Sequence, residues 1–146
     1  MGIIDRITPE GQRFYAELAQ LDKLEVRIGF QAGEASSEDG VDICDIAAWN
    51  EMGTEHTPAR PFMRQTVDNN EDKIMSFCAN QAKGIGSGGS AQDVYKKIGV
   101  FGKGLVQQTI ESGNFAPNAP STIRKKGSAK PLIDTGQMRQ SVNYVI

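Results

Sequence analysis

Residues 61–105 read PFMRQTVDNNEDKIMSFCANQAKGIGSGGSAQDVYKKIGVFGKGL, and this stretch decides the fold. It contains two segments with apolar residues at helical spacing, separated by a glycine-rich break. Pro61 suits the start of the first segment, because the first turn of a helix needs no backbone N–H donor. Ser90 and Asp93 resemble a capping box at the start of the second segment. The stretch therefore predicts two long helices in succession.

Each predicted helix has one apolar face that can pack. The residues of these faces are Val67, Ile74, Phe77 and Cys78 in the first helix, and Val94, Ile98, Phe101 and Leu105 in the second. Between them, residues 84–90 read GIGSGGS, whose glycines leave the backbone little reason to be ordered, so we expect a hinge or a flexible connector. GIGSGG also fits the dinucleotide pattern Gly-x-Gly-x-x-Gly. We discount that function because a helix rather than a strand precedes it.

Three further glycines, Gly99, Gly102 and Gly104, lie inside the second predicted helix. Each weakens a helix by roughly 1 kcal/mol relative to alanine. Two explanations are open at this point. Either a neighbouring helix or another subunit packs closely against these positions, or the helix is kinked or broken near Gly102.

Outside this stretch, the sequence predicts two more helices and two strands. A capping threonine and a proline open an amphipathic helix over residues 9–21. A short helix over residues 43–52 ends at Gly53. Residues 24–30 and 142–146 alternate apolar with polar side chains, as strands with one buried face do. We therefore expect an α+β fold, with a small antiparallel or mixed sheet packed against two long helices, plus short helices and long loops.

The composition is that of an ordinary soluble protein. The chain has 146 residues, of which 23% are charged and 38% hydrophobic, and its formal net charge is −2. We expect one domain over residues 1–146, with no membrane span, no export signal and no general attraction to nucleic acid. Two cysteines and one histidine are too few for a structural zinc site. We therefore expect no cofactor, buried free thiols at Cys44 and Cys78, and a surface or interface role for His56.

Near the end of the chain, residues 132–136 read LIDTG, a string that also surrounds the catalytic aspartate of retroviral and pepsin-like proteases. Those enzymes need two carboxylates that share a proton, and most of a protease domain after the motif. Because only residues 137–146 follow it here, we reject a protease and expect no enzymatic activity. Asp134 instead fits a helix N-cap, with Gln137 three residues later to complete a capping box.

The loop predicted over residues 113–131 is unusually long and contains the one concentrated positive patch of the sequence. Its basic residues are Arg124, Lys125, Lys126 and Lys130. Such runs are commonly just solvated, but a basic loop of this length can also contact phosphates or an acidic protein surface. No aromatic residue lies among them, which argues against base stacking. A small nucleic-acid-binding regulatory protein that uses residues 124–130 is the alternative to the structural role given next.

Two motifs, taken in order, resemble a known protein family. The first reads IAAWNEMGTEHTPARPFMRQTVD at residues 46–68, and the second reads APSTIRKKGSAKPLIDTGQMRQSVNYVI at residues 119–146. Together they resemble the tail-completion or head-tail joining proteins of tailed bacteriophages, a group that includes lambda-like minor tail protein Z and Mu-like virion morphogenesis proteins. The resemblance covers most of the chain from Val26 onward. The chain departs from the family pattern in the glycine-rich break at residues 84–90 and in stopping directly after the last strand.

The resemblance implies a virion structural protein without catalytic residues, located in the virion neck and, during assembly, in the host cytoplasm. It implies a ring between the capsid connector and the tail, with a hexamer as the expectation and a dodecamer as the alternative. Partners would be connector and tail-tube or terminator proteins, and DNA that passes through. The residues expected at these contacts are Glu51, Arg60, Phe62, Arg124, Lys125, Lys126 and Lys130. We expect the loop over residues 113–131 and the segment over residues 55–62 to make them, with Arg60 as the main anchor.

Overall fold

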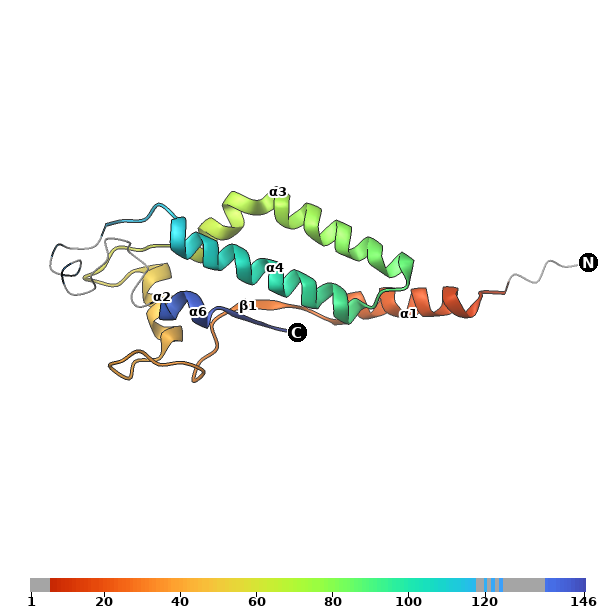
Figure 1. Cartoon of the computed structure of the whole chain (residues 1–146), viewed down its shortest axis with the longest axis horizontal. Coiled ribbons are helices and arrows are strands. Elements are labelled where there is room, and N and C mark those ends of the chain that lie inside the picture. Colours follow the sequence, from red (N-terminus) through yellow and green to blue (C-terminus); the bar gives the residue numbers. More distant parts are fainter. Residues whose placement is uncertain (1–5, 118–119, 121, 123, 125–135) are drawn as a thin grey trace, which may run out of the picture.

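The computed structural model describes residues 6–117, 120, 122, 124 and 136–146 (Figure 1). Its elements are α1 (Pro9–Lys23), β1 (Arg27–Gly29), α2 (Ile43–Met52), α3 (Phe62–Lys83), the 3-10 helix η1 (Gly84–Ser87), α4 (Ala91–Ser112), α6 (Gln137–Ser141) and β2 (Asn143–Val145). The chain is mostly helical, with two long helices packed together and one two-stranded antiparallel sheet, which confirms the predicted fold class. None of these helices combines the length and the apolar character needed to cross a membrane.

The two long helices, α3 and α4, lie side by side and run in opposite directions (Figure 1). Ser90 caps α4 as predicted, because its hydroxyl accepts a hydrogen bond from the Asp93 N–H at 3.1 Å. Phe77 of α3 stacks on Phe101 of α4, with ring centroids 4.0 Å apart and an angle of 7° between the planes. The predicted apolar faces therefore meet, except that Val67 lies outside the contact with 54% of its surface exposed.

The glycine-rich connector is an ordered turn. The Ile85 side chain is buried, and the Gly89 N–H donates to the Gly84 carbonyl at 2.9 Å. Gly88 has φ 94°, in the left-handed region that favours glycine. The expectation of a flexible connector is wrong, because the buried isoleucine anchors the turn and the glycines supply the backbone geometry that it requires.

The two-stranded sheet packs against α4. β1 and β2 pair antiparallel, with Ile28 opposite Tyr144, over shorter spans than the sequence predicts. A Cβ atom added at Gly99 would collide with the Tyr144 ring, and one added at Gly102 with the end of the Ile28 side chain. Gly104 faces open space. Of the two explanations for these glycines, close packing is therefore correct for Gly99 and Gly102, and the helix continues through both.

The largest buried cluster lies at the end of the helix pair where α2 and α6 pack (Figure 1). Its residues are Ile43, Ala47, Phe62, Val106, Ile110, Met138 and Val142. The Phe30 ring approaches the Phe62 ring edge-on, with centroids 5.9 Å apart. α2 has the predicted limits: the Asp42 carboxylate accepts a hydrogen bond from the Cys44 N–H at 2.9 Å, and Gly53 ends the helix. This cluster holds together the end of the molecule where α2 meets the start of α3.

Helix α6 begins two residues later than the predicted capping box requires. Gly136, with φ 76°, precedes it, so that Gln137 is the first helical residue rather than the third. The Gln137 amide donates to the Ser36 carbonyl and ties α6 to the loop before α2. The prediction of a capping box is therefore wrong at Gln137, and Asp134 lies outside the described residues.

Candidate interaction surfaces

Glu51 builds a corner between α2 and α3. Its carboxylate accepts hydrogen bonds from the N–H groups of Met63 at 2.8 Å and Arg64 at 3.2 Å. Pro61, which precedes α3, offers no side-chain cap. The Glu51 carboxylate therefore satisfies two free donors at the start of α3, and its negative charge is favourable at that end of a helix.

Arg60 is buried beneath this corner, with 5% of its surface exposed. Its Nε atom donates to the Ala116 carbonyl at 2.8 Å, and its Nη2 atom donates to the Pro117 carbonyl at 3.3 Å. Its backbone N–H donates to the Asn50 carbonyl at 2.6 Å. Burial lowers the pKa of the Arg60 guanidinium through desolvation, although an arginine stays charged at neutral pH. Arg60 thus joins the end of α2, the start of α3 and the segment after α4.

The burial of this motif corrects the expected contact residues. Phe62 is fully buried in the core cluster, and Arg60 is almost fully buried. Both carboxylate oxygens of Glu51 accept hydrogen bonds from backbone N–H groups at the start of α3. A residue that contacts a partner directly must be accessible in the free protomer. The expectation that Arg60 and Phe62 touch a partner is therefore wrong, and Glu51 has an internal role. The apolar residue directly after Pro61 was a signal of burial, because a first-turn phenylalanine commonly faces a core.

Accessible residues surround the corner and form the α2 surface, which consists of Trp49, Met52 and the turn over residues 55–58. Trp49 is 49% and Met52 73% exposed. Thr54 and Thr57 exchange backbone hydrogen bonds of 2.9 and 3.4 Å that close the turn. The exposed turn contains His56, in line with the surface position expected for it. Figure 1 places α2 at the opposite end of the molecule from the free end of α1.

The basic loop is described in part. Arg124 is exposed, whereas Lys125, Lys126 and Lys130 lie outside the described residues. Its first residues, beyond Gly113, are held by the Arg60 contacts. The predicted contact of these basic residues with phosphates or an acidic partner therefore stays a prediction.

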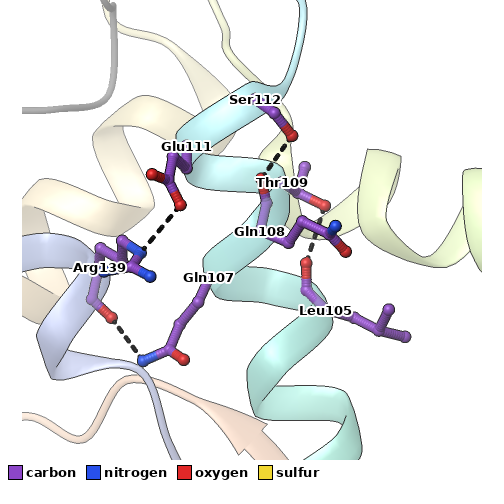
Figure 2. A network of polar contacts seen from close by, with 7 residues as sticks. All are labelled: Leu105, Gln107, Gln108, Thr109, Glu111, Ser112 and Arg139. Carbon is purple, nitrogen blue, oxygen red and sulfur yellow. Dashed lines mark hydrogen bonds and ion pairs between the residues drawn. The ribbon is translucent and has the colours of Figure 1, made fainter.

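A polar network fixes the C-terminal segment beside α4 (Figure 2). The Gln107 amide donates to the Arg139 carbonyl at 3.1 Å, and Arg139 Nε lies 3.5 Å from a Glu111 carboxylate oxygen. Both charged side chains are about half exposed, so this ion pair contributes little to stability. The Thr109 and Ser112 hydroxyls donate to carbonyls one turn earlier in α4. The network is structural, because it positions α6 and hence β2.

Helix α1 is the most exposed element. None of its residues is buried, and it extends past the end of the α3–α4 pair (Figure 1). Three apolar side chains, Phe14, Tyr15 and Leu18, are exposed on it. A helix that leaves apolar side chains this accessible is a candidate contact surface.

Two hydrogen bonds attach α1 to the first turns of α4. The Glu17 carboxylate accepts from the Ala91 N–H at 2.8 Å, and the Tyr95 hydroxyl donates to the Leu21 carbonyl at 2.7 Å. These contacts involve the second half of α1. The orientation of the helix is therefore set by α4, and the side of its first half that carries Phe14 lies beside the η1 turn.

A shallow apolar groove of about 420 Å³ lies between α3 and α4. Its residues are Phe77 from α3 and Lys96, Lys97, Val100 and Phe101 from α4. The stacked phenylalanine rings provide its base, and Val100 is exposed beside them. The groove, the α1 face and the α2 surface are the three candidate contact sites of the protomer.

The described residues contain no group of three or more histidine, cysteine or acidic side chains that could hold a metal ion. Cys44 and Cys78 are free thiols, as predicted, but both are half-buried rather than buried. No family model, curated protein or solved structure matches this chain. Its function must therefore be argued from its own residues and surfaces.

Proposed function

We propose that this chain is a virion structural protein of a tailed bacteriophage, a tail-completion or head-tail joining component that forms a ring in the neck. The observation that carries the proposal is α1, a helix of 15 residues that buries none of its residues in the protomer and leaves Phe14, Tyr15 and Leu18 exposed. Apolar side chains that remain this accessible favour assembly with another chain. The motifs at residues 46–68 and 119–146, which resemble the joining family, supply the particular class.

The small sheet also favours assembly. Among the described strands, β1 and β2 pair only with each other, so each keeps one open edge. An open edge can accept a strand from a neighbouring copy through main-chain hydrogen bonds. In a ring, each copy uses two different surfaces and the contacts close on themselves. We expect a hexamer, with a dodecamer as the alternative.

In this proposal the α2 surface contacts the neighbouring connector or tail-tube proteins. Trp49 and Met52 are accessible, and aromatic and methionine side chains are enriched at protein contacts. Arg60 and Glu51 support this surface from within the protomer rather than by touching a partner. Arg124 is accessible to an acidic partner or to DNA that passes through the neck.

Deletion of the gene from the phage or prophage genome that carries it tests the proposal. We expect negative-stain images to show full heads and separate tails, and joined particles to return when the wild-type gene is supplied in trans. Joined particles at normal yield without the gene would overturn the proposal. Strong, salt-dependent DNA binding by the purified protein would instead favour a regulatory protein, because such binding weakens steeply with salt.

Complementation with Trp49→Ser tests the α2 surface within the same experiment. We expect fewer joined particles, because the substitution removes an exposed aromatic contact without disturbing the core cluster. Val67→Ser is the matched control, since Val67 is a similarly exposed apolar residue that belongs to α3 and not to the α2 surface. Equal yields from the two variants would assign the partner contact to another surface.

A further inference from the structure

A polar pocket, separate from the three contact sites, lies between the first half of α3 and the last turns of α4. Its volume is about 550 Å³, which is in the range of ligand sites in proteins. The side chains that line it are uncharged and carry amide or hydroxyl groups. Those on the two helices are Gln65, Asn69 and Asn70 from α3 and Gln108, Thr109 and Ser112 from α4. We call this site the amide pocket.

Helix α3 bends where it lines the amide pocket (Figure 1). Asn70 has non-helical angles, φ −127° and ψ 16°, although α3 contains no proline or glycine. The Thr66 hydroxyl donates to the Phe62 carbonyl at 2.7 Å, and the Asn70 amide donates to the Thr66 carbonyl at 2.8 Å. Side chains that bond to carbonyls one turn earlier compete with the backbone ladder and bend a helix. The sequence of α3 thus produces the bend locally, in the wall of the pocket.

Hydrogen bonds fix the end of the amide pocket beyond α4. The Gln65 amide donates to the Asn114 carbonyl at 3.4 Å, which joins α3 to the segment after α4. Two residues later, the same segment is held by the bonds from Arg60 to the carbonyls of Ala116 and Pro117. The walls are therefore in place in the free protomer, so that little ordering of the site opposes binding.

Two amides of the pocket keep their hydrogen-bonding capacity. Asn69 and Gln108 are exposed, and within the part of the chain that the structure describes neither side chain has a hydrogen-bond partner. Figure 2 shows the Gln108 amide on the side of α4 opposite Arg139. The Thr109 and Ser112 hydroxyls donate within α4, so each still offers its oxygen as an acceptor. The pocket therefore presents donors and acceptors without charge.

The spacing of these groups fits the main chain of an extended polypeptide. Gln65 and Asn69 on α3, like Gln108 and Ser112 on α4, are four residues apart and hence about 6 Å apart along the helix. Peptide groups that point to one edge of an extended strand recur every two residues, or about 6.4–6.8 Å. An amide side chain both donates and accepts, as a peptide group does. The two walls therefore match the two edges of one extended strand.

The lining of the amide pocket argues against other classes of ligand. Phosphates and carboxylates are commonly bound by arginine or lysine, and a nucleobase stacks on an aromatic ring. Among the described residues, none that lines the pocket is charged or aromatic. The charged residues next to the lining positions in sequence are Arg64, Asp68 and Glu111, and Glu111 faces Arg139 on the other side of α4. An uncharged ligand rich in donors and acceptors fits this lining.

We infer that the amide pocket binds the main chain of an extended polypeptide segment. Gln65 and Asn69 pair with peptide groups on one edge of the segment, and Gln108 pairs with those on the other. Main-chain hydrogen bonds supply the affinity, so recognition depends little on the side chains of the segment. The segment comes from a second copy or from a neighbouring protein, two sources with the same chemistry. The inference goes beyond the proposed function and does not depend on the phage role.

A blocked, uncharged pentapeptide, acetyl-Ser-Ala-Ser-Ala-Ser amide, is the probe for the inference. By NMR on the isotope-labelled full chain, we expect it to shift the side-chain amide signals of Asn69 and Gln108, with a dissociation constant in the millimolar range. The same peptide with both alanine nitrogens methylated should bind about tenfold more weakly. It keeps its side chains but loses the N–H donors of one edge.

The double variant N69A/Q108A removes the two amides that have no partner. We expect it to bind the pentapeptide about tenfold more weakly than the wild type, because peptide groups in the pocket then lose hydrogen bonds. N80A/Q92A is the matched control, since it replaces two exposed amides on the same helices outside the pocket and should bind like the wild type. Equal midpoints in urea denaturation check that both variants fold normally.

Three results would each overturn the inference: no shift of the Asn69 and Gln108 signals at about 10 mM pentapeptide, equal affinity for the methylated peptide, or wild-type affinity in N69A/Q108A. Shifts of these signals by maltotriose but not by the peptide would also overturn it and identify a sugar site. Once peptide binding is established, light scattering identifies the source of the segment. Weaker self-association of N69A/Q108A than of N80A/Q92A assigns it to a second copy, and equal self-association assigns it to another protein. None of these measurements uses phage particles, so a failed gene-deletion test would reject only the phage role.

Discussion

A buried arginine holds the corner that supports the α2 surface. Arg60 donates to the carbonyls of Ala116 and Pro117 while almost none of its surface is exposed. We predict that Arg60→Ala lowers the free energy of unfolding by about 2–3 kcal/mol, because it removes charge-assisted hydrogen bonds and leaves a cavity. Arg60→Met, which keeps most of the side-chain volume, should lose about half as much. Urea denaturation measures both, and an unchanged midpoint for Arg60→Ala would contradict the prediction.

Glu51 acts on the same corner through the start of α3. We predict that Glu51→Ala costs about 1 kcal/mol of stability, because the N–H groups of Met63 and Arg64 lose their acceptor and the helix end loses a favourable charge. Glu51→Gln should cost less, since an amide oxygen can still accept one of these hydrogen bonds. Thermal unfolding of the two variants gives the comparison. Equal losses would assign the effect to charge alone.

These two residues also show where sequence reasoning about the contact site fails. The resemblance to the joining family predicts that the segment over residues 55–62 contacts a partner, with Arg60 as the main anchor. Its residues instead bind the protomer's own backbone and core. A sequence shows that an arginine carries hydrogen-bond donors, but it does not show which acceptors they meet. The carbonyl groups that accept from Arg60 belong to residues more than fifty positions later in the chain. Only tertiary structure brings them together.

Among the elements, α4 offers a matched series of glycines. We predict that Gly99→Ala destabilises the protein by about 1–2 kcal/mol, because the new methyl group must displace the Tyr144 ring, and this exceeds the gain in helix propensity. Gly104→Ala should stabilise it by up to about 1 kcal/mol, since that position faces open space. Gly102→Ala should lie between them, because the end of the flexible Ile28 side chain can move. Denaturant unfolding of the three variants would contradict this order if Gly104→Ala were the least stable.

The success of the helix predictions has a local cause, whereas the failures have causes in the tertiary structure. α2, α3 and α4 were predicted closely because proline, capping side chains and terminal glycines act within a few residues of a helix end. The prediction of a flexible connector is wrong because the order of this turn depends on burial of Ile85, a tertiary effect. The prediction of a capping box at Gln137 is wrong because the Gln137 amide donates to the carbonyl of Ser36, about a hundred residues earlier. The strands are shorter than predicted, since alternation marks a buried face but does not supply a pairing partner.

For the whole molecule, the two ends of an elongated protomer carry different surfaces. The α2 surface lies at one end, above the core cluster, and α1 extends at the other (Figure 1). The sequence predicts an amphipathic α1 but not that none of its residues is buried, because burial depends on where the chain places every other element. This separation allows one end to contact further copies while the other remains available to a different protein.

Because α1 is the most exposed element, it leads to a prediction about amide hydrogen exchange in the free and the assembled protein. In the free protomer α1 buries no residue and two hydrogen bonds attach it to α4, so its amide hydrogens should exchange much faster than those of the α3–α4 pair. If α1 contacts a neighbouring copy, as the proposed ring allows, raising the protein concentration should slow exchange in α1 by on the order of tenfold, because bound copies resist local opening.

Hydrogen–deuterium exchange followed by mass spectrometry, at low and high protein concentration, measures this change. The amides of the α3–α4 pair should exchange equally slowly at both concentrations, and they serve as the internal control. Wild-type α1 amides that exchange equally fast at both concentrations, despite association seen by light scattering, would place the contact between copies elsewhere. The open edges of β1 and β2 would then be the surfaces to examine, because slowed exchange confined to Arg27–Gly29 or Asn143–Val145 would identify strand pairing as the contact.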